Sequence, residues 1–121
     1  MREIKASLIQ VRVTRFKGDA GQQIKKIRSR VFSREQHVDP AIDFDGLDQD
    51  AVHVLVQLNG DFVGTGRLLH DGHMGRIAVL KPARGMGLGK QIVSALVHEA
   101  EKHGMDRVFL GAQDHAVAFY E

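Results

Sequence analysis

Three glycines at alternate positions follow a short apolar segment and stand where a helical pattern begins. They are Gly85, Gly87 and Gly89, and Arg84 comes directly before them. Glycine lets a backbone come close to a ligand and direct its N–H groups toward it. The N-terminus of the following helix adds unpaired donors and a partial positive charge, and Arg84 adds a full charge. The segment therefore predicts an anion-binding loop, with a phosphate group as the anion that fits it best.

Two well-known phosphate-binding loops do not match this spacing. A Walker loop, G-x-x-x-x-G-K-[ST], would need a glycine at Arg84 and a hydroxyl residue at Gln91. A dinucleotide-binding loop, G-x-G-x-x-G, would need a glycine at Lys90. These mismatches disfavour a nucleoside triphosphatase and a dinucleotide enzyme. A tight turn without any ligand is the remaining alternative, and the charge of Arg84 and the strand before the turn argue against it.

The same segment resembles a signature of the GNAT N-acetyltransferase superfamily. Residues 84–89, Arg-Gly-Met-Gly-Leu-Gly, are similar to its [QR]-x-x-G-x-[GA] motif, with a strand before and a helix after. Residues 31–48 carry V-F, E-Q and D-F-D-G-L-D in the order of a bacterial subgroup of predicted acetyltransferases. Residues 112–121 carry A-Q and F-Y-E, as that subgroup does. Together the resemblance spans about residues 30–121.

The resemblance implies that acetyl-CoA is the co-substrate. We expect no metal to take part, because Asp71-Gly72 between His70 and His73 indicates a hairpin turn, and Lys102 stands where H-E-x-x-H needs its second histidine. The resemblance places the diphosphate of acetyl-CoA on the backbone of the glycine loop, and the pantetheine arm beside the preceding strand as an additional strand. The residues expected to bind acetyl-CoA are Ile77, Ala78, Val79, Arg84, Gly85, Met86, Gly87, Leu88, Gly89 and Lys90.

The resemblance also implies one catalytic residue, and the chemistry of the acceptor calls for a second. The resemblance assigns Tyr120 the protonation of the departing thiolate, and a phenol with a pKa of about 10 is protonated at neutral pH. The acceptor ammonium, with a pKa of about 10.4, must lose a proton before it attacks. We expect Glu35 to receive that proton, with His37, Asp43 and Asp45 as the alternatives. All four residues lie in one acidic segment, and the negative charge of this segment could also attract a cationic amine. Core packing of Tyr120, and capping or solvation of the acidic residues, are the alternatives.

The expected reaction transfers an acetyl group from acetyl-CoA to a primary amine, on a small molecule or a peptide, by direct attack in a ternary complex. The chain has no cysteine, which excludes an acyl-enzyme formed on a thiol. A non-catalytic CoA-binding or sensing module is the alternative from another functional class.

Length and composition indicate one globular domain. The chain has 121 residues, 43% of them hydrophobic and 26% charged, with a net charge of +2. It lacks the run of about 20 apolar residues that a membrane span needs, and it lacks a signal peptide pattern. It also lacks a sustained basic block, and seven aromatic residues are too few for base stacking. We therefore expect a cytoplasmic protein that binds neither membranes nor nucleic acids.

The hydrophobic pattern predicts an α/β (α+β) fold with a mixed, mainly antiparallel sheet flanked by helices. A helix is expected from Gly18, with Lys25, Lys26, Arg28 and Arg30 on its solvated side. A glycine pair inside the middle strand of a meander indicates a bulge or a close backbone approach. The expected order is a strand at 7–15, the helix from 18, a loop with one short helical turn at 33–50, strands at 52–58, 62–69 and 74–79, a helix at 87–103, a strand at 107–111 and the start of a helix at 115–121.

The resemblance carries one further expectation about the C-terminus. Family chains normally continue past the F-Y-E segment into two more antiparallel strands, and this chain ends at Glu121. We therefore expect a single domain, residues 1–121, that is short at its C-terminus. The strand at 107–111 would then have an unpaired edge, unless a partner chain, as in a homodimer, supplies the neighbour.

Overall fold

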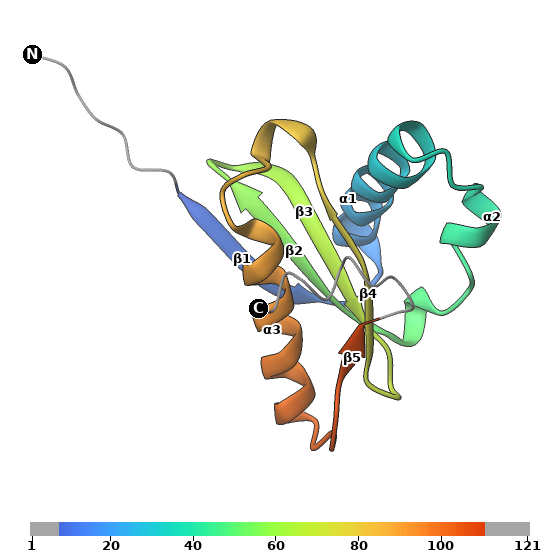
Figure 1. Cartoon of the computed structure of the whole chain (residues 1–121), viewed down its shortest axis with the longest axis vertical. Helices are drawn as coiled ribbons and strands as arrows, with labels where there is room; N and C mark the ends of the chain where they lie inside the picture. The colour runs from blue at the N-terminus through green and yellow to red at the C-terminus, as the bar shows by residue number, and fades with distance from the viewer. Residues whose placement is uncertain (1–7, 111–121) are drawn as a thin grey trace, which may run out of the picture.

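The computed structural model describes residues 8–110, which form one five-stranded sheet with helices on both faces (Figure 1). The sheet order is β1-β2-β3-β4-β5. Neighbours from β1 to β4 pair antiparallel, and β5 pairs parallel to β4. The strands are β1 (Ile9–Thr14), β2 (Val52–Leu58), β3 (Asp61–Leu68), β4 (His73–Val79) and β5 (Phe109–Leu110). The predicted mixed, mainly antiparallel sheet is confirmed.

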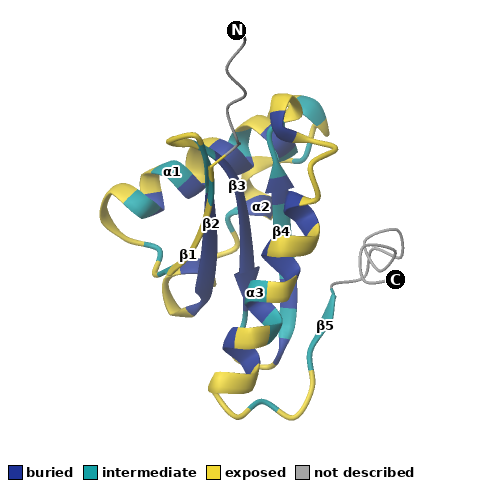
Figure 2. Cartoon of the chain, turned by 90° about the vertical axis from the view of Figure 1, so that its left-hand side faces the viewer, coloured by how far each residue is buried: buried dark blue, intermediate teal, exposed yellow. Residues whose placement is uncertain are grey.

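The helical elements divide between the two faces of the sheet (Figure 2). The longest, α3, packs on one face against the valines of β2, while α1 packs on the other face against Leu55 and Ala78. The helical segments are α1 (Gly18–Arg28), the π-helix η1 (Ser29–Glu35), α2 (Pro40–Asp43), the 3₁₀ turns η2 (Asp48–Asp50) and η3 (Lys81–Ala83), and α3 (Leu88–Lys102). No helix within residues 8–110 is long and apolar enough to span a membrane.

The prediction of a loop with one short helical turn at 33–50 is only partly right, because this stretch holds more helical structure than one turn. The helix that begins at Gly18 continues without a break through η1 to Glu35, and α2 and η2 follow as short helical segments. Asp39 starts α2 by accepting a hydrogen bond from the amide of Ala41 at 2.9 Å, with Pro40 at the first helical position. The aspartates in this stretch led to the prediction of a loop, because Asp favours caps and turns over helix interiors.

Helix α3 lies very close to β3, and the glycine pair in β3 makes this approach possible. A Cβ atom added at Gly66 would lie within van der Waals overlap of the Ile92 side chain, and one at Gly64 would lie 3.2 Å from Ile92 Cδ1. The close approach predicted at these glycines is confirmed.

Helix α3 ends where predicted, since Gly104 follows its C-cap with φ of +71°.

A bulge interrupts β4 in the middle of the sheet. Thr65 pairs with Ala78, but Arg67 pairs with Gly75, so two residues of β4 stand opposite Gly66 alone. One of those two residues is Arg76, whose φ of +49° lies in the left-handed region. The bulge lies between the β4 segment paired with β5 and the segment that leads to the glycine loop.

Candidate functional site

The backbone at the start of α3 presents a row of N–H groups that find no acceptor in the part of the chain that the structure describes. Gly85 and Gly87 have φ of +84° and +76°, and Gly87 caps the helix without a side-chain hydrogen bond. The first amide here that bonds to the chain is that of Gln91, which donates to the Gly87 carbonyl at 3.2 Å. Within the described residues, the amides of 85–90 therefore remain available to a ligand, as an anion-binding loop requires.

The second part of the site is the outer edge of β4. Strand β5 pairs with β4 only at His73 and Met74, so β4 from residue 75 onward has no neighbour there among residues 8–110. The Leu80 amide donates to the Val63 carbonyl in β3, whereas the Val79 carbonyl accepts from Arg84 Nε at 2.8 Å. Successive residues of a strand point their polar groups to opposite sides, so Val79 faces the open edge.

These two features fit the group that the sequence implies. A row of free amides at a helix N-terminus suits a diphosphate, and an open strand edge suits an arm that carries amide groups. The glycine loop follows β4 directly, so the edge and the amides form one continuous surface. The expected residues 77–79 and 84–90 are therefore brought together by the fold.

Arg84 is bound to the protein in this structure. Its Nη2 lies 2.8 Å from Glu35 Oε2 and 3.0 Å from Oε1, while its Nε binds the Val79 carbonyl. The side chains of Arg84 and Glu35 are 40% and 25% exposed. Arg84 and Glu35 are thus direct partners, although the sequence predicts diphosphate binding for Arg84 and proton acceptance for Glu35.

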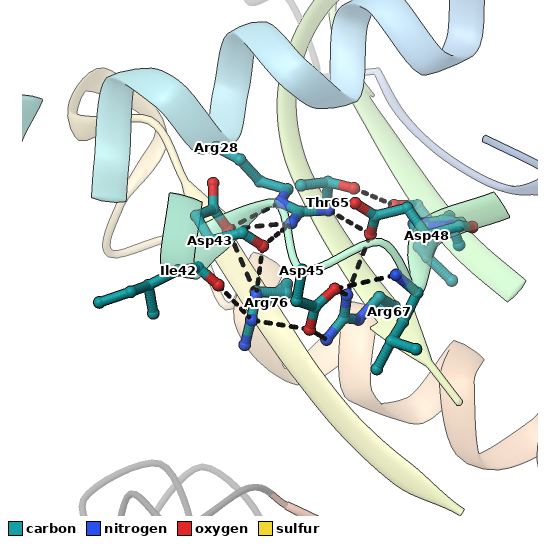
Figure 3. Close-up of polar contacts among 11 residues, drawn as sticks. Arg28, Ile42, Asp43, Asp45, Asp48, Thr65, Arg67 and Arg76 are labelled. Carbon is teal, nitrogen blue, oxygen red and sulfur yellow. Dashed lines mark hydrogen bonds and ion pairs between the residues drawn. The ribbon is translucent and has the colours of Figure 1, made fainter. Parts of the chain in front are cut away.

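The acidic segment that was expected to face the acceptor is largely neutralised by buried arginines (Figure 3). Asp43 and Asp48 are 2% and 4% exposed, and Arg28 is fully buried between them. Arg28 Nη2 lies 2.9 Å from Asp43 Oδ1, and its Nη1 lies 2.6 Å from Asp48 Oδ1. Asp43 and Asp48 are therefore held in ion pairs and do not line an open channel.

Asp45 joins this cluster from a more exposed position. It receives two hydrogen bonds from Arg67, at 2.9 and 3.0 Å, and one from Arg76 Nη2 at 3.1 Å. The hydrogen bonds from Arg67 lower the pKa of Asp45 to about 2. Burial lowers the pKa of Arg67, but the ion pairs with Asp45 and Asp48 outweigh it and raise that pKa above its usual value. Arg28, Asp43, Asp45, Asp48, Arg67 and Arg76 thus form one cluster of ion pairs, in which Asp45 is ionised at neutral pH.

Residues 21–121 match the model of the acetyltransferase (GNAT) family. The chain belongs to this family. Among its relatives is YjcF of Bacillus subtilis, named an uncharacterized N-acetyltransferase, which is 37% identical over 78% of this chain and 70% of its own length.

Two solved structures agree with the membership of this GNAT chain. ElaA of Escherichia coli has a TM-score of 0.80 at 29% identity, covering 93% of this chain and 84% of its own. An acyl-CoA N-acyltransferase from Pseudomonas aeruginosa has a TM-score of 0.79 at 30% identity, covering 93% and 85%. The family and these relatives identify the chain as an acyl-CoA-dependent acetyltransferase.

His37 and Tyr120 are two further residues of this GNAT chain that the sequence predicts for the site. His37 is exposed, and its φ is +58°. Tyr120 lies outside the described residues. No group of three or more His, Cys, Asp or Glu among residues 8–110 could hold a metal ion.

Sequence analysis missed the arginines of the buried cluster. Arg28 was expected on the solvated side of its helix, and this was wrong, because the side chain is buried. Its spacing from Ile24 and Val31, four and three residues away, places it on the buried face of that helix. The positive charge nevertheless indicated an exposed side chain, because arginine is rarely buried without a partner. Its acidic partners lie 15 and 20 residues further along the chain, too far away to be recognised from the local pattern.

A hollow beside the end of β4 is lined by basic side chains. It has a volume of about 510 Å³ and lies between α1, η1 and the ends of β3 and β4. Among residues 8–110 no carboxylate lines it, and its lining includes Lys25, Lys26, Arg30, Arg34, Phe62 and Leu80.

Proposed function

We propose that this chain transfers an acetyl group from acetyl-CoA to the nitrogen of a primary amine, by direct attack in a ternary complex. Membership of the GNAT family establishes acetyl transfer in general. The observation that carries the finer proposal is the row of free amides at 85–90 beside the open edge of β4. With no cysteine in the chain, a thiol-bound intermediate has no residue to form on.

The chain's own groups divide the binding of acetyl-CoA between them. The amides of 85–90 and the N-terminus of α3 bind the diphosphate, and the edge at Ile77, Ala78 and Val79 binds the amides of the arm. Acetyl-CoA itself supplies the activated acyl carbon and a thiolate leaving group. Arg84 can add its charge to the diphosphate once its bond to Glu35 opens.

Deprotonation of the acceptor is the costliest part of the reaction for the protein. An amine with a pKa of about 10.4 is mostly protonated at pH 7, a handicap of about 4.6 kcal/mol. We propose Glu35 as the base, acting when Arg84 has moved to the donor and left the carboxylate free. The same movement would then link donor binding to acceptor activation.

We propose Tyr120 as the acid that protonates the departing thiolate. Its contribution is modest, because a thiol with a pKa of about 8.5 already leaves fairly readily. The acceptor is an amine on a small molecule or a peptide, and its identity is a matter for direct assay. The cytoplasmic location and a homodimer stay predictions from the sequence.

One pair of measurements tests the function. The full chain is titrated with acetyl-CoA in a calorimeter, and thiol release is followed with a panel of primary amines. Saturable binding with amine-dependent thiol release supports the proposal. Binding without turnover favours the non-catalytic CoA-binding module, and a chain that binds no acetyl-CoA overturns both.

A further inference from the structure

Arg76 holds a backbone conformation that side chains other than glycine rarely adopt. Its φ of +49° occurs at the bulge where Arg76 and Ile77 of β4 stand opposite Gly66 of β3. A left-handed conformation crowds the Cβ atom against the backbone and is unfavourable for arginine. Such a conformation persists only where the surroundings hold it, and strained residues of this kind gather at functional sites.

The side chain of Arg76 supplies that restraint. Its Nε donates to the Asp43 carbonyl at 3.1 Å, and its Nη2 donates to the Ile42 carbonyl at 3.2 Å and to Asp45 Oδ2 at 3.1 Å. Nε also lies 3.3 Å from Asp43 Oδ1. The guanidinium is thus tied to the end of α2 and to the segment that joins α2 to η2, as Figure 3 shows.

Asp45 connects the two strands on either side of the bulge. One of its oxygens binds both Arg67 on β3 and Arg76 on β4, and the other binds Arg67. The paired positions Arg67 and Gly75 border the bulge on one side. A single carboxylate therefore fixes the side chain of the strained residue relative to the neighbouring strand.

The bulge lies at the far end of the open edge of β4. That edge begins at Val79 beside the glycine loop, and it closes at Met74, where β5 pairs. An arm that enters from the diphosphate site and follows the edge from Val79 to Ile77 comes to its reacting end next to the bulge. A bulge leaves a backbone group out of the ladder, so residues 76–77 can offer it to the ligand.

We propose that Asp45 is a positioning residue for acetyl transfer, which acts through Arg76 to hold the β4 bulge in the shape that receives the thioester end of acetyl-CoA. This proposal rests on the function proposed above. It differs from a general role in stability, because Asp45 contacts Arg76 directly and also bonds to Arg67 on the neighbouring strand, whereas the carboxylate of Asp48 in the same cluster pairs with Arg67 and Arg28 and not with Arg76.

Asp48 provides the matched control. It belongs to the same cluster and is more deeply buried, with contacts of 2.6 Å to Arg28 and 3.1 Å to Arg67. It does not contact Arg76, so its loss weakens the cluster without releasing the side chain at the bulge. The comparison of Asp45→Asn with Asp48→Asn therefore separates positioning from stability.

The first test combines kinetics with a backbone measurement on the full chain. Asp45→Asn should lower kcat about tenfold and change the KM for acetyl-CoA less than twofold, whereas Asp48→Asn should keep kcat within twofold. The amide resonance of Ile77, recorded by NMR without acetyl-CoA, should shift in Asp45→Asn and stay in place in Asp48→Asn. Equal losses of kcat in both variants, or an unshifted Ile77 amide in Asp45→Asn, would overturn the proposal.

A second pair of variants does not depend on Asp48→Asn folding well. Arg76→Gly and Arg76→Ala both remove the anchored side chain, but only glycine adopts φ of +49° without strain. Arg76→Gly should keep at least fivefold more kcat than Arg76→Ala, and equal kcat values would count against the bulge. A wild-type chain that binds acetyl-CoA but releases no thiol would instead refute the proposed function itself.

Discussion

The carboxylate of Glu35 and the guanidinium of Arg84 form an ion pair of 2.8 Å that joins the end of η1 to the loop before α3. Arg84 also covers the Val79 carbonyl on the open edge of β4. A donor that uses this loop and this edge therefore meets Arg84 first. Glu35 can accept a proton and Arg84 can bind the diphosphate only after the ion pair between them has broken.

Replacing Glu35 with Gln should separate these two functions. Without the ion pair, Arg84 is free to meet the diphosphate, and a partly exposed pair of this kind is worth up to about 1 kcal/mol. The Kd for CoA should therefore fall about two- to fivefold, as calorimetry would measure. The kcat at neutral pH should fall at least tenfold, since the variant has no carboxylate to accept the proton.

Two comparisons make the Glu35 result interpretable. Glu101→Gln removes an exposed carboxylate from α3 and should leave both constants unchanged. Arg84→Gln should weaken CoA binding while sparing the carboxylate of Glu35. An unchanged kcat in Glu35→Gln would show that another group accepts the proton.

Gly87→Glu should abolish CoA binding. The substitution places a side chain and a negative charge at the loop whose free amides receive the diphosphate, and it forces a residue with a Cβ into φ of +76°. Calorimetric titration with CoA measures the effect. Gly104→Glu is the matched control, because Gly104 has φ of +71°, also with open space around its Cβ position, at the opposite end of α3. Equal affinity in the two variants would place the CoA site elsewhere.

Tyr120→Phe should slow turnover and leave the affinity for CoA nearly unchanged. The substitution removes only the hydroxyl proposed to protonate the thiolate, and the size of the ring is kept. The expected loss in kcat is about tenfold, less than is usual for a general acid, because the thiolate already leaves fairly readily. Parallel losses of kcat and CoA affinity would indicate that Tyr120 serves in packing instead.

Asp45→Asn should reduce stability in a pH-dependent way. The hydrogen bonds from Arg67 lower the pKa of Asp45 from 3.8 to about 2, so its ionised form stabilises the fold at neutral pH. This stabilisation is fully present above about pH 4, and it is lost as the pH falls from there through the folded-state pKa of about 2. Urea unfolding should show wild type more stable than the variant at pH 7, with the two converging near pH 2. A difference independent of pH would show that ionisation of Asp45 is not the cause.

The strands and the glycine loop were predictable because their signals are local. The hydrophobic pattern of β2 and the glycine loop at 84–89 each depend on residues within one short window. The close approach at Gly66 was predictable for the same reason, since a glycine inside a strand has few other uses.

The buried cluster could not be predicted in this way. Arg28 and Arg67 are paired with aspartates about 20 residues away, and charge complementarity at that distance leaves no periodic signal. The aspartates themselves suggested caps and a solvated loop, which is their commoner use. Only the fold shows that three arginines and three aspartates share one partly enclosed space.

Arg28→Met should destabilise the protein strongly. Arg28 is fully buried, and its loss leaves Asp43 and Asp48 as buried carboxylates with weaker compensation from Arg76 and Arg67. Breaking a buried ion pair by removing one partner costs about 3–5 kcal/mol. We expect a loss near the lower end, about 3 kcal/mol, because each carboxylate keeps one arginine. Urea unfolding at pH 7 measures it.

Arg30→Met is the matched control for this prediction. Arg30 lies two residues further along the same continuous helix but is exposed, so its replacement should change stability by less than about 0.5 kcal/mol. Methionine retains much of the length of the arginine stem, so the comparison isolates the buried guanidinium and its ion pairs. Equal and small effects in the two variants would show that the aspartates are satisfied without Arg28. The cluster would then owe its charge balance to Arg67 and Arg76 alone.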